Sequence, residues 1–176
     1  MVEDQLPLII AGLLFLPYHH HMIGLALGGV IREWRFFRQA ALALLVSTLL
    51  IFLAGICVAL TTAPPVMFEI KGSALSGAVL AALIGVAAGL ASVDDAGRRE
   101  LIGLAATAHI SIYPAWIGLQ IIFGEATTNE IIDHLFTFLI NIAVLLFTAM
   151  FTYALSGMKG DGIRHFIQRI TGGKNI

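Results

Sequence analysis

Residues 72–93 read GSALSGAVLAALIGVAAGLASV, a stretch without Asp, Glu, Lys or Arg. A helix needs roughly 20 apolar residues to cross about 30 Å of hydrocarbon, and this stretch is long enough. Four further stretches lack the same four residue types: Gln5–Ile31, Gln39–Phe68, Leu101–Gly124 and His134–Met158. We therefore expect five transmembrane helices, near residues 6–30, 39–60, 73–93, 101–123 and 134–157.

The composition of the whole chain supports an all-α integral membrane protein. Hydrophobic residues make up 59% and charged residues 12% of the 176 residues, and the mean hydropathy is +0.93. Soluble domains carry about 25% charged residues, so this chain has too little charge to solvate a globular surface. The net charge of −1 excludes a nucleic-acid partner, because phosphate backbones require a basic surface. The single cysteine, Cys57, excludes a disulfide framework and a cysteine-based zinc site.

The distribution of Lys and Arg predicts the orientation of the helices. An odd number of spans places nine of the ten cationic residues on one side, and only Lys71 lies on the other. The positive-inside rule then predicts an external N-terminus and a cytoplasmic C-terminus. The nine residues are Arg32, Arg35, Arg38, Arg98, Arg99, Lys159, Arg164, Arg169 and Lys174.

We expect one transmembrane domain over residues 1–160, followed by a cytoplasmic amphipathic tail over residues 161–176. In this tail Ile163, Phe166, Ile167 and Ile170 follow helical spacing. Such a helix is suited to the inner membrane interface, next to lipid headgroups.

Small residues indicate which faces of the spans pack closely. The third span carries Ser73, Gly77, Ala81, Gly85 and Gly89 at four-residue spacing, and the first span carries Gly24 and Gly28. Small residues let helix backbones approach, which is how membrane helices associate. His20 lies four residues before Gly24, so we expect it on the packed face. We also expect a homo-oligomer or a subunit of a membrane complex.

Polar residues inside the spans predict a functional site, because they are costly in hydrocarbon. The first span contains Tyr18, His19, His20 and His21 directly after Pro17, and the fourth contains Thr107, His109, Ser111, Tyr113, Pro114 and Gln120. His20 and His109 each lie roughly 12–15 Å from the cytoplasmic end of their spans, near the bilayer midplane. We therefore predict a shared transport or ligand site. Its residues are His20, His109, Tyr113 and Asn141, with Tyr18 and Gln120 adjoining; His134, at the external end, is expected to matter much less.

The histidines also suggest a metal or cofactor. Desolvation favours neutral imidazole, and no carboxylate lies within the spans to oppose it. Neutral imidazole binds transition metals and haem iron, so a transition metal or a tetrapyrrole is the candidate cofactor. Hard cations such as Na⁺, Mg²⁺ and Ca²⁺ prefer carboxylate oxygens. The candidate ligands are His19, His20, His21 and His109.

Two parts of the chain share a pattern that is typical of an inverted repeat. Residues 17–25, PYHHHMIGL, correspond to residues 111–119, SIYPAWIGL, and a long span follows each. Because three spans separate the two starts, the two units would face opposite ways. Inverted repeats around a midplane site are characteristic of secondary transporters.

The order of these features resembles a known family, the bacterial and archaeal uncharacterised hydrophobic domain proteins, domain of unknown function 389. The resemblance runs from about Leu16 to Met158. It rests on LPYHHHMIGLALG at 16–28, IYPAWIG at 112–118 and FLINIA at 138–143. This chain departs from the family at both proline segments, where histidines and tyrosines replace small and apolar residues. The resemblance implies a fold and no particular activity. We expect the protein in a bacterial or archaeal cytoplasmic (inner) membrane.

Three functions remain open from the sequence. The first is a transport or channel-like protein that moves a proton, a small solute or a soft metal ion through the midplane site. The second is a subunit of a redox or photosynthetic complex that holds haem, chlorophyll or copper on histidine. The third is an assembly subunit whose histidines link helices. We do not expect an enzyme, because no nucleophile, base and acid occur together.

Overall fold

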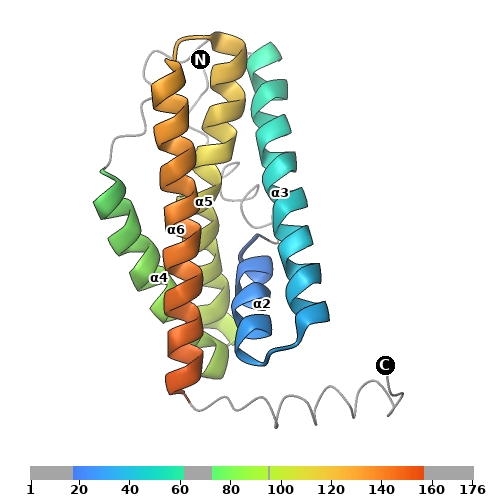
Figure 1. The fold of residues 1–176 in the computed structure, drawn as a ribbon, viewed down its shortest axis with the longest axis vertical. Coiled ribbons are helices and arrows are strands. Elements are labelled where there is room, and N and C mark those ends of the chain that lie inside the picture. Colours follow the sequence, from blue (N-terminus) through green and yellow to red (C-terminus); the bar gives the residue numbers. More distant parts are fainter. Residues whose placement is uncertain (1–17, 62–72, 95, 157–176) are drawn as a thin grey trace.

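The computed structural model describes residues 18–61, 73–94 and 96–156, and within these ranges the chain is entirely helical apart from short turns (Figure 1). With the labels of Figure 1, the helices are α2 (Tyr18–Val30), α3 (Trp34–Thr61), α4 (Ala74–Asp94), α5 (Ala96–Phe123) and α6 (Thr128–Leu155). The predicted all-α class therefore agrees with the described part of the chain.

Four of these helices, α3 to α6, are long and apolar enough to cross a membrane, which indicates an integral membrane protein. The remaining helix, α2, has 13 residues. Residues 6–17 of the first predicted span, with Pro17, lie outside the described residues, as does the predicted amphipathic tail at 161–176.

The helices begin earlier than the uncharged stretches predict. α3 begins at Trp34 rather than residue 39, α5 at Ala96 rather than 101, and α6 at Thr128 rather than 134. A charged residue is excluded from hydrocarbon but not from a helix, so the helix continues into the headgroup region. A capping box sets the start of α6: the backbone N–H of Glu130 donates to Thr127 Oγ1, and the backbone N–H of Thr127 donates to Glu130 Oε2.

Consecutive helices run in alternate directions (Figure 1). The α2–α3 turn, the α4–α5 junction and the end of α6 consequently lie at one end of the bundle, and the α5–α6 turn lies at the other. Gly124 closes α5 with a φ of 68°, and Arg32 adopts a φ of 54° between α2 and α3. These two residues take the left-handed conformation that a tight exit from a helix requires.

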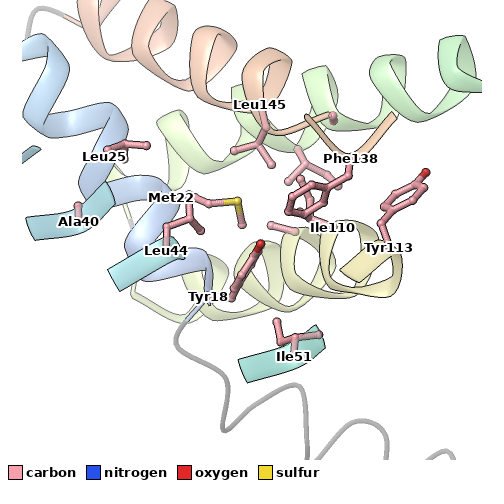
Figure 2. Packing of buried hydrophobic residues seen from close by; sticks show 13 residues of the cluster. Tyr18, Met22, Leu25, Ala40, Leu44, Ile51, Ile110, Tyr113, Phe138 and Leu145 are labelled. Atoms are coloured by element: carbon pink, nitrogen blue, oxygen red, sulfur yellow. The ribbon is translucent and has the colours of Figure 1, made fainter. Parts of the chain in front are cut away.

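The core lies where α2 meets the other helices. Tyr18 and Met22 from α2 point among Leu44, Ile110, Phe138 and Leu145 (Figure 2). Many large apolar side chains instead lie on the outside of the bundle, among them Leu42, Leu60, Phe147 and Leu155. In a membrane this outer surface faces lipid, so its exposure carries no hydrophobic penalty.

Glycines bring helix backbones close at two crossings. Gly85 and Gly89 of α4 face α6, where an added Cβ at Gly85 would overlap the Thr148 hydroxyl and one at Gly89 would lie 2.6 Å from Thr152 Cβ. Gly55 of α3 and Gly118 of α5 meet similarly, because an added Cβ on either would overlap a backbone carbonyl of the other helix. The small residues of the third span thus face α6, and α4 runs parallel to α6.

The position of His20 corrects the sequence-based prediction. Gly24 and Gly28 of α2 pack against Phe36, Phe37 and Ala40 of α3, but His20 is exposed and its neighbour His19 is buried. Residues four apart on a helix differ in direction by about 40°, and here that rotation carries His20 away from the packed face.

Candidate functional site

A group of polar atoms lies where α4, α5 and α6 meet. It consists of the Gly77 carbonyl of α4, His109 and Tyr113 of α5, and Asn141 of α6; we call it the polar cluster. His109 Nε2 lies 3.1 Å from the Gly77 carbonyl oxygen, and Asn141 Nδ2 donates to the Tyr113 hydroxyl at 3.4 Å. The cluster therefore joins three helices through uncharged groups.

Asn141 is the most deeply buried member, with 0% of its surface exposed. Its amide nitrogen donates to Tyr113, but its Oδ1 atom has no hydrogen-bond partner among the described residues. Gly77 makes room for it, since a Cβ there would lie 3.1 Å from Asn141 Nδ2 and 3.2 Å from Oδ1. A buried acceptor without a donor costs about 1–3 kcal/mol, so the cluster retains an acceptor that a ligand could use.

The partner of His109 determines its tautomer. A carbonyl oxygen can only accept a hydrogen bond, so Nε2 must carry the proton that is donated to Gly77. In the neutral ring Nδ1 is then an acceptor. Half-buried His109 therefore contributes a second acceptor to the polar cluster.

The cluster lies at mid-height in the bundle. His109 is midway along α5, which has 28 residues, and Asn141 is midway along α6, which also has 28. At 1.5 Å per residue each is about 20 Å from either end of its helix. The membrane depth predicted for His109 from the sequence stays a prediction.

His134, on α6, joins the cluster to one end of the bundle. Its ring stacks on Trp116 of α5 with centroids 4.2 Å apart and planes 15° apart, and its centroid is 6.2 Å from that of Tyr113. From the sequence His134 is expected to lie apart from the site, whereas in the structure it lies beside Tyr113. The signal in the sequence was the seven-residue spacing of His134 and Asn141, which puts both on one face of α6.

Gln120 and Tyr18 are engaged away from the polar cluster. Gln120 Oε1 accepts from the backbone N–H of Ala126, within the α5–α6 turn. The Thr48 hydroxyl donates to the Leu44 carbonyl, so Tyr18 must be the donor in its 2.8 Å bond to Thr48. Tyr18 consequently links α2 to α3.

The three consecutive histidines differ in how deeply they are buried. The buried His19 ring lies on Gly103 of α5, where an added Cβ would overlap the ring, while His20 is exposed and His21 is half-buried. Gly103 and His109 are six residues apart, about 240° around α5, so they lie on different faces. His19 therefore meets α5 on a different face from His109, and the shared site of His20 and His109 stays a prediction.

The metal-ligand hypothesis gains no support from the geometry. Within 18–61, 73–94 and 96–156, no three His, Cys, Asp or Glu side chains come together in a way that could hold a metal ion. The rings of His19 and His20 lie 3.8 Å apart, but no third such ligand joins them in these ranges. The polar cluster itself contains one histidine.

Comparison with protein families agrees with the resemblance seen in the sequence. The family described as Domain of unknown function (DUF389) matches residues 14–158, which is most of the chain. The chain belongs to the DUF389 family. The comparisons with curated proteins and with solved structures give no match. The family description names no function, so only the residues of this DUF389 protein indicate what it does.

Proposed function

We propose that this DUF389 protein is a transport or channel-like membrane protein whose cargo passes the polar cluster of Gly77, His109, Tyr113 and Asn141. The observation that carries the proposal is the buried Asn141 Oδ1 atom, an acceptor without a donor among the described residues at mid-height in the bundle. Polar side chains at this depth are costly, and those that persist in membrane proteins mark pathways and binding sites.

The chemistry of the cluster favours a proton or a small neutral solute as cargo. Asn141 Oδ1 and His109 Nδ1 accept hydrogen bonds, and no carboxylate, Lys or Arg belongs to the cluster. An anion would meet acceptors without a compensating positive charge, and a hard cation would lack the carboxylates it prefers. A solute with N–H or O–H groups, or a proton carried by water, matches these acceptors.

Flux through liposomes tests the proposal directly. The purified protein is reconstituted with a pH-sensitive dye inside, and proton flux is followed after a pH step; urea uptake is followed by light scattering. We expect the parent to move at least one of these cargoes. His109→Ala and Tyr113→Phe should lower the rate by at least about tenfold, equivalent to about 1.4 kcal/mol.

Ile112→Ala is the matched control, because Ile112 lies on the same helix but is 40% exposed. It should leave the rate unchanged. Parent liposomes no more permeable than empty ones to both cargoes would contradict the proposal. A visible spectrum of the same preparation tests the cofactor alternative, since a bound tetrapyrrole would give a Soret band.

A further inference from the structure

Trp116 and His134 lie between the polar cluster and the α5–α6 end of the bundle. His134 is in the second turn of α6, about 9 Å from its start at Thr128. It is half-buried, whereas Asp133 and the residues of the first turn, 128–130, are exposed. His134 thus stands between exposed residues and the interior.

Ring contacts continue from His134 to the middle of the bundle. The His134 centroid lies 6.2 Å from Tyr113, and the Tyr113 centroid lies 6.5 Å from His109. Asn141 bonds the hydroxyl of the same Tyr113. His134, Tyr113 and His109 therefore follow one another from the α5–α6 end to mid-height, and the buried Phe138 of α6 belongs to the same core cluster as Tyr113.

Between α4 and α6, the other side of the polar cluster is lined by apolar residues. Ala81, Leu145 and Ala149 are buried there, each with 2% of its surface exposed or less. The nearby hydroxyls of Thr148 and Thr152 donate to carbonyls of their own helix. Gly85 and Gly89 bring α4 into backbone contact with α6 in the same region, so the packing is tight.

The bond made by His134 determines what it offers to a solute. Its Nδ1 atom lies 2.8 Å from the Glu130 carbonyl oxygen, so Nδ1 carries the proton and Nε2 is an acceptor in the neutral ring. The acceptor character of His134 therefore matches that of Asn141 and His109.

We propose that His134 and Trp116 form the entrance to the polar cluster, that this entrance binds small solutes which donate hydrogen bonds, and that the layer of Ala81, Leu145 and Ala149 closes the opposite end. The inference rests on the proposed function for its cargo. The direction of access can be measured without any flux.

Cysteine labelling tests the direction of access. Tyr113→Cys and Leu145→Cys are each made in a Cys57→Ser background, reconstituted, and treated with a membrane-impermeant methanethiosulfonate from one face at a time. The cysteine at 113 should react from the face that bears the α5–α6 turn. The cysteine at 145 should react at least about tenfold more slowly from either face. Reaction at 113 only from the opposite face, or equal rates at 113 and 145, would overturn the entrance whether or not flux is found.

Two substitutions of His134 test its role as an acceptor. His134→Phe keeps a ring that can stack on Trp116 but removes Nε2, and His134→Gln removes the ring but keeps an acceptor. If the acceptor is what the solute uses, His134→Phe should lower urea or proton flux by at least about tenfold and His134→Gln should retain more of it. Parental flux in His134→Phe would show that His134 only packs, and this result would leave the proposed function intact. Elution at the same volume as the parent in size-exclusion chromatography confirms that each variant is folded.

Discussion

Asn141 combines complete burial with incomplete hydrogen bonding. Its Nδ2 atom makes one long bond of 3.4 Å, and its Oδ1 atom makes none among the described residues. A leucine of similar size would avoid the cost of an unsatisfied acceptor, about 1–3 kcal/mol. A residue that lowers stability at a buried position is typical of a functional site, where activity and stability oppose each other.

The first prediction concerns this opposition. We expect Asn141→Leu to leave the thermal stability in detergent unchanged or to raise it, because the substitution removes the unsatisfied amide oxygen. We also expect it to abolish flux. Leu139→Ala on the lipid-facing side of α6 is the control, and it should leave flux at the parental level. A large fall in melting temperature with unchanged flux would mean that Asn141 serves only to hold the helices together.

At the scale of elements, the contact between α4 and α6 depends on glycine. An added Cβ at Gly85 would meet the Leu145 carbonyl as well as the Thr148 side chain, and a backbone carbonyl cannot move without its helix. Gly24 differs, since an added Cβ there would lie 3.6 Å from Ala40 Cβ, an ordinary contact distance. Helix propensity favours Ala over Gly at both positions, but only at Gly85 would the added methyl group collide with a neighbouring helix. Comparing the two substitutions therefore distinguishes the effect of close packing from that of helix propensity.

The second prediction follows from this difference. Gly85→Ala should lower the free energy of unfolding by about 1–3 kcal/mol, through overpacking against α6. Gly24→Ala should leave the free energy of unfolding unchanged or raise it slightly. Thermal unfolding in detergent measures both. Equal melting temperatures for Gly85→Ala and the parent would show that α4 does not need backbone contact with α6.

For the whole molecule, the alternating directions of the helices place the arginines of the α2–α3 region at one end of the bundle and the α5–α6 turn at the other (Figure 1). The positive-inside rule predicts that the arginine end faces the cytoplasm. With this orientation, we expect the entrance proposed at His134 to open to the outside. The inverted repeat and the oligomer stay predictions.

The third prediction tests this orientation. In a Cys57→Ser background, the cysteine of Asn129→Cys should react with a membrane-impermeant thiol reagent in intact cells. The cysteine of Arg35→Cys should react only after the membrane has been permeabilised. Both positions are exposed, so neither depends on an opening of the bundle. Labelling of position 35 in intact cells would reverse the orientation and place the entrance on the cytoplasmic side.

The sequence by itself determined the helical membrane domain, the residues of the four long apolar helices to within a few positions, and the family. It also identified His109, Tyr113 and Asn141, because a polar residue in an apolar stretch is visible without knowing its neighbours. Insertion into lipid is a local property: the transfer free energy of a segment depends on its own side chains. Depth along a helix is equally local, since it follows from a rise of 1.5 Å per residue.

Only the tertiary structure decided how each helix is rotated about its axis. His19, His20 and His21 are adjacent in sequence, yet contacts with α3 and α5 turn His19 inward and leave His20 exposed. The same rotations bring His134 beside Tyr113 and the Gly77 carbonyl beside His109. Hydropathy is similar all round these helices, so it sets no preferred face, and packing against neighbouring backbones determines which polar groups meet.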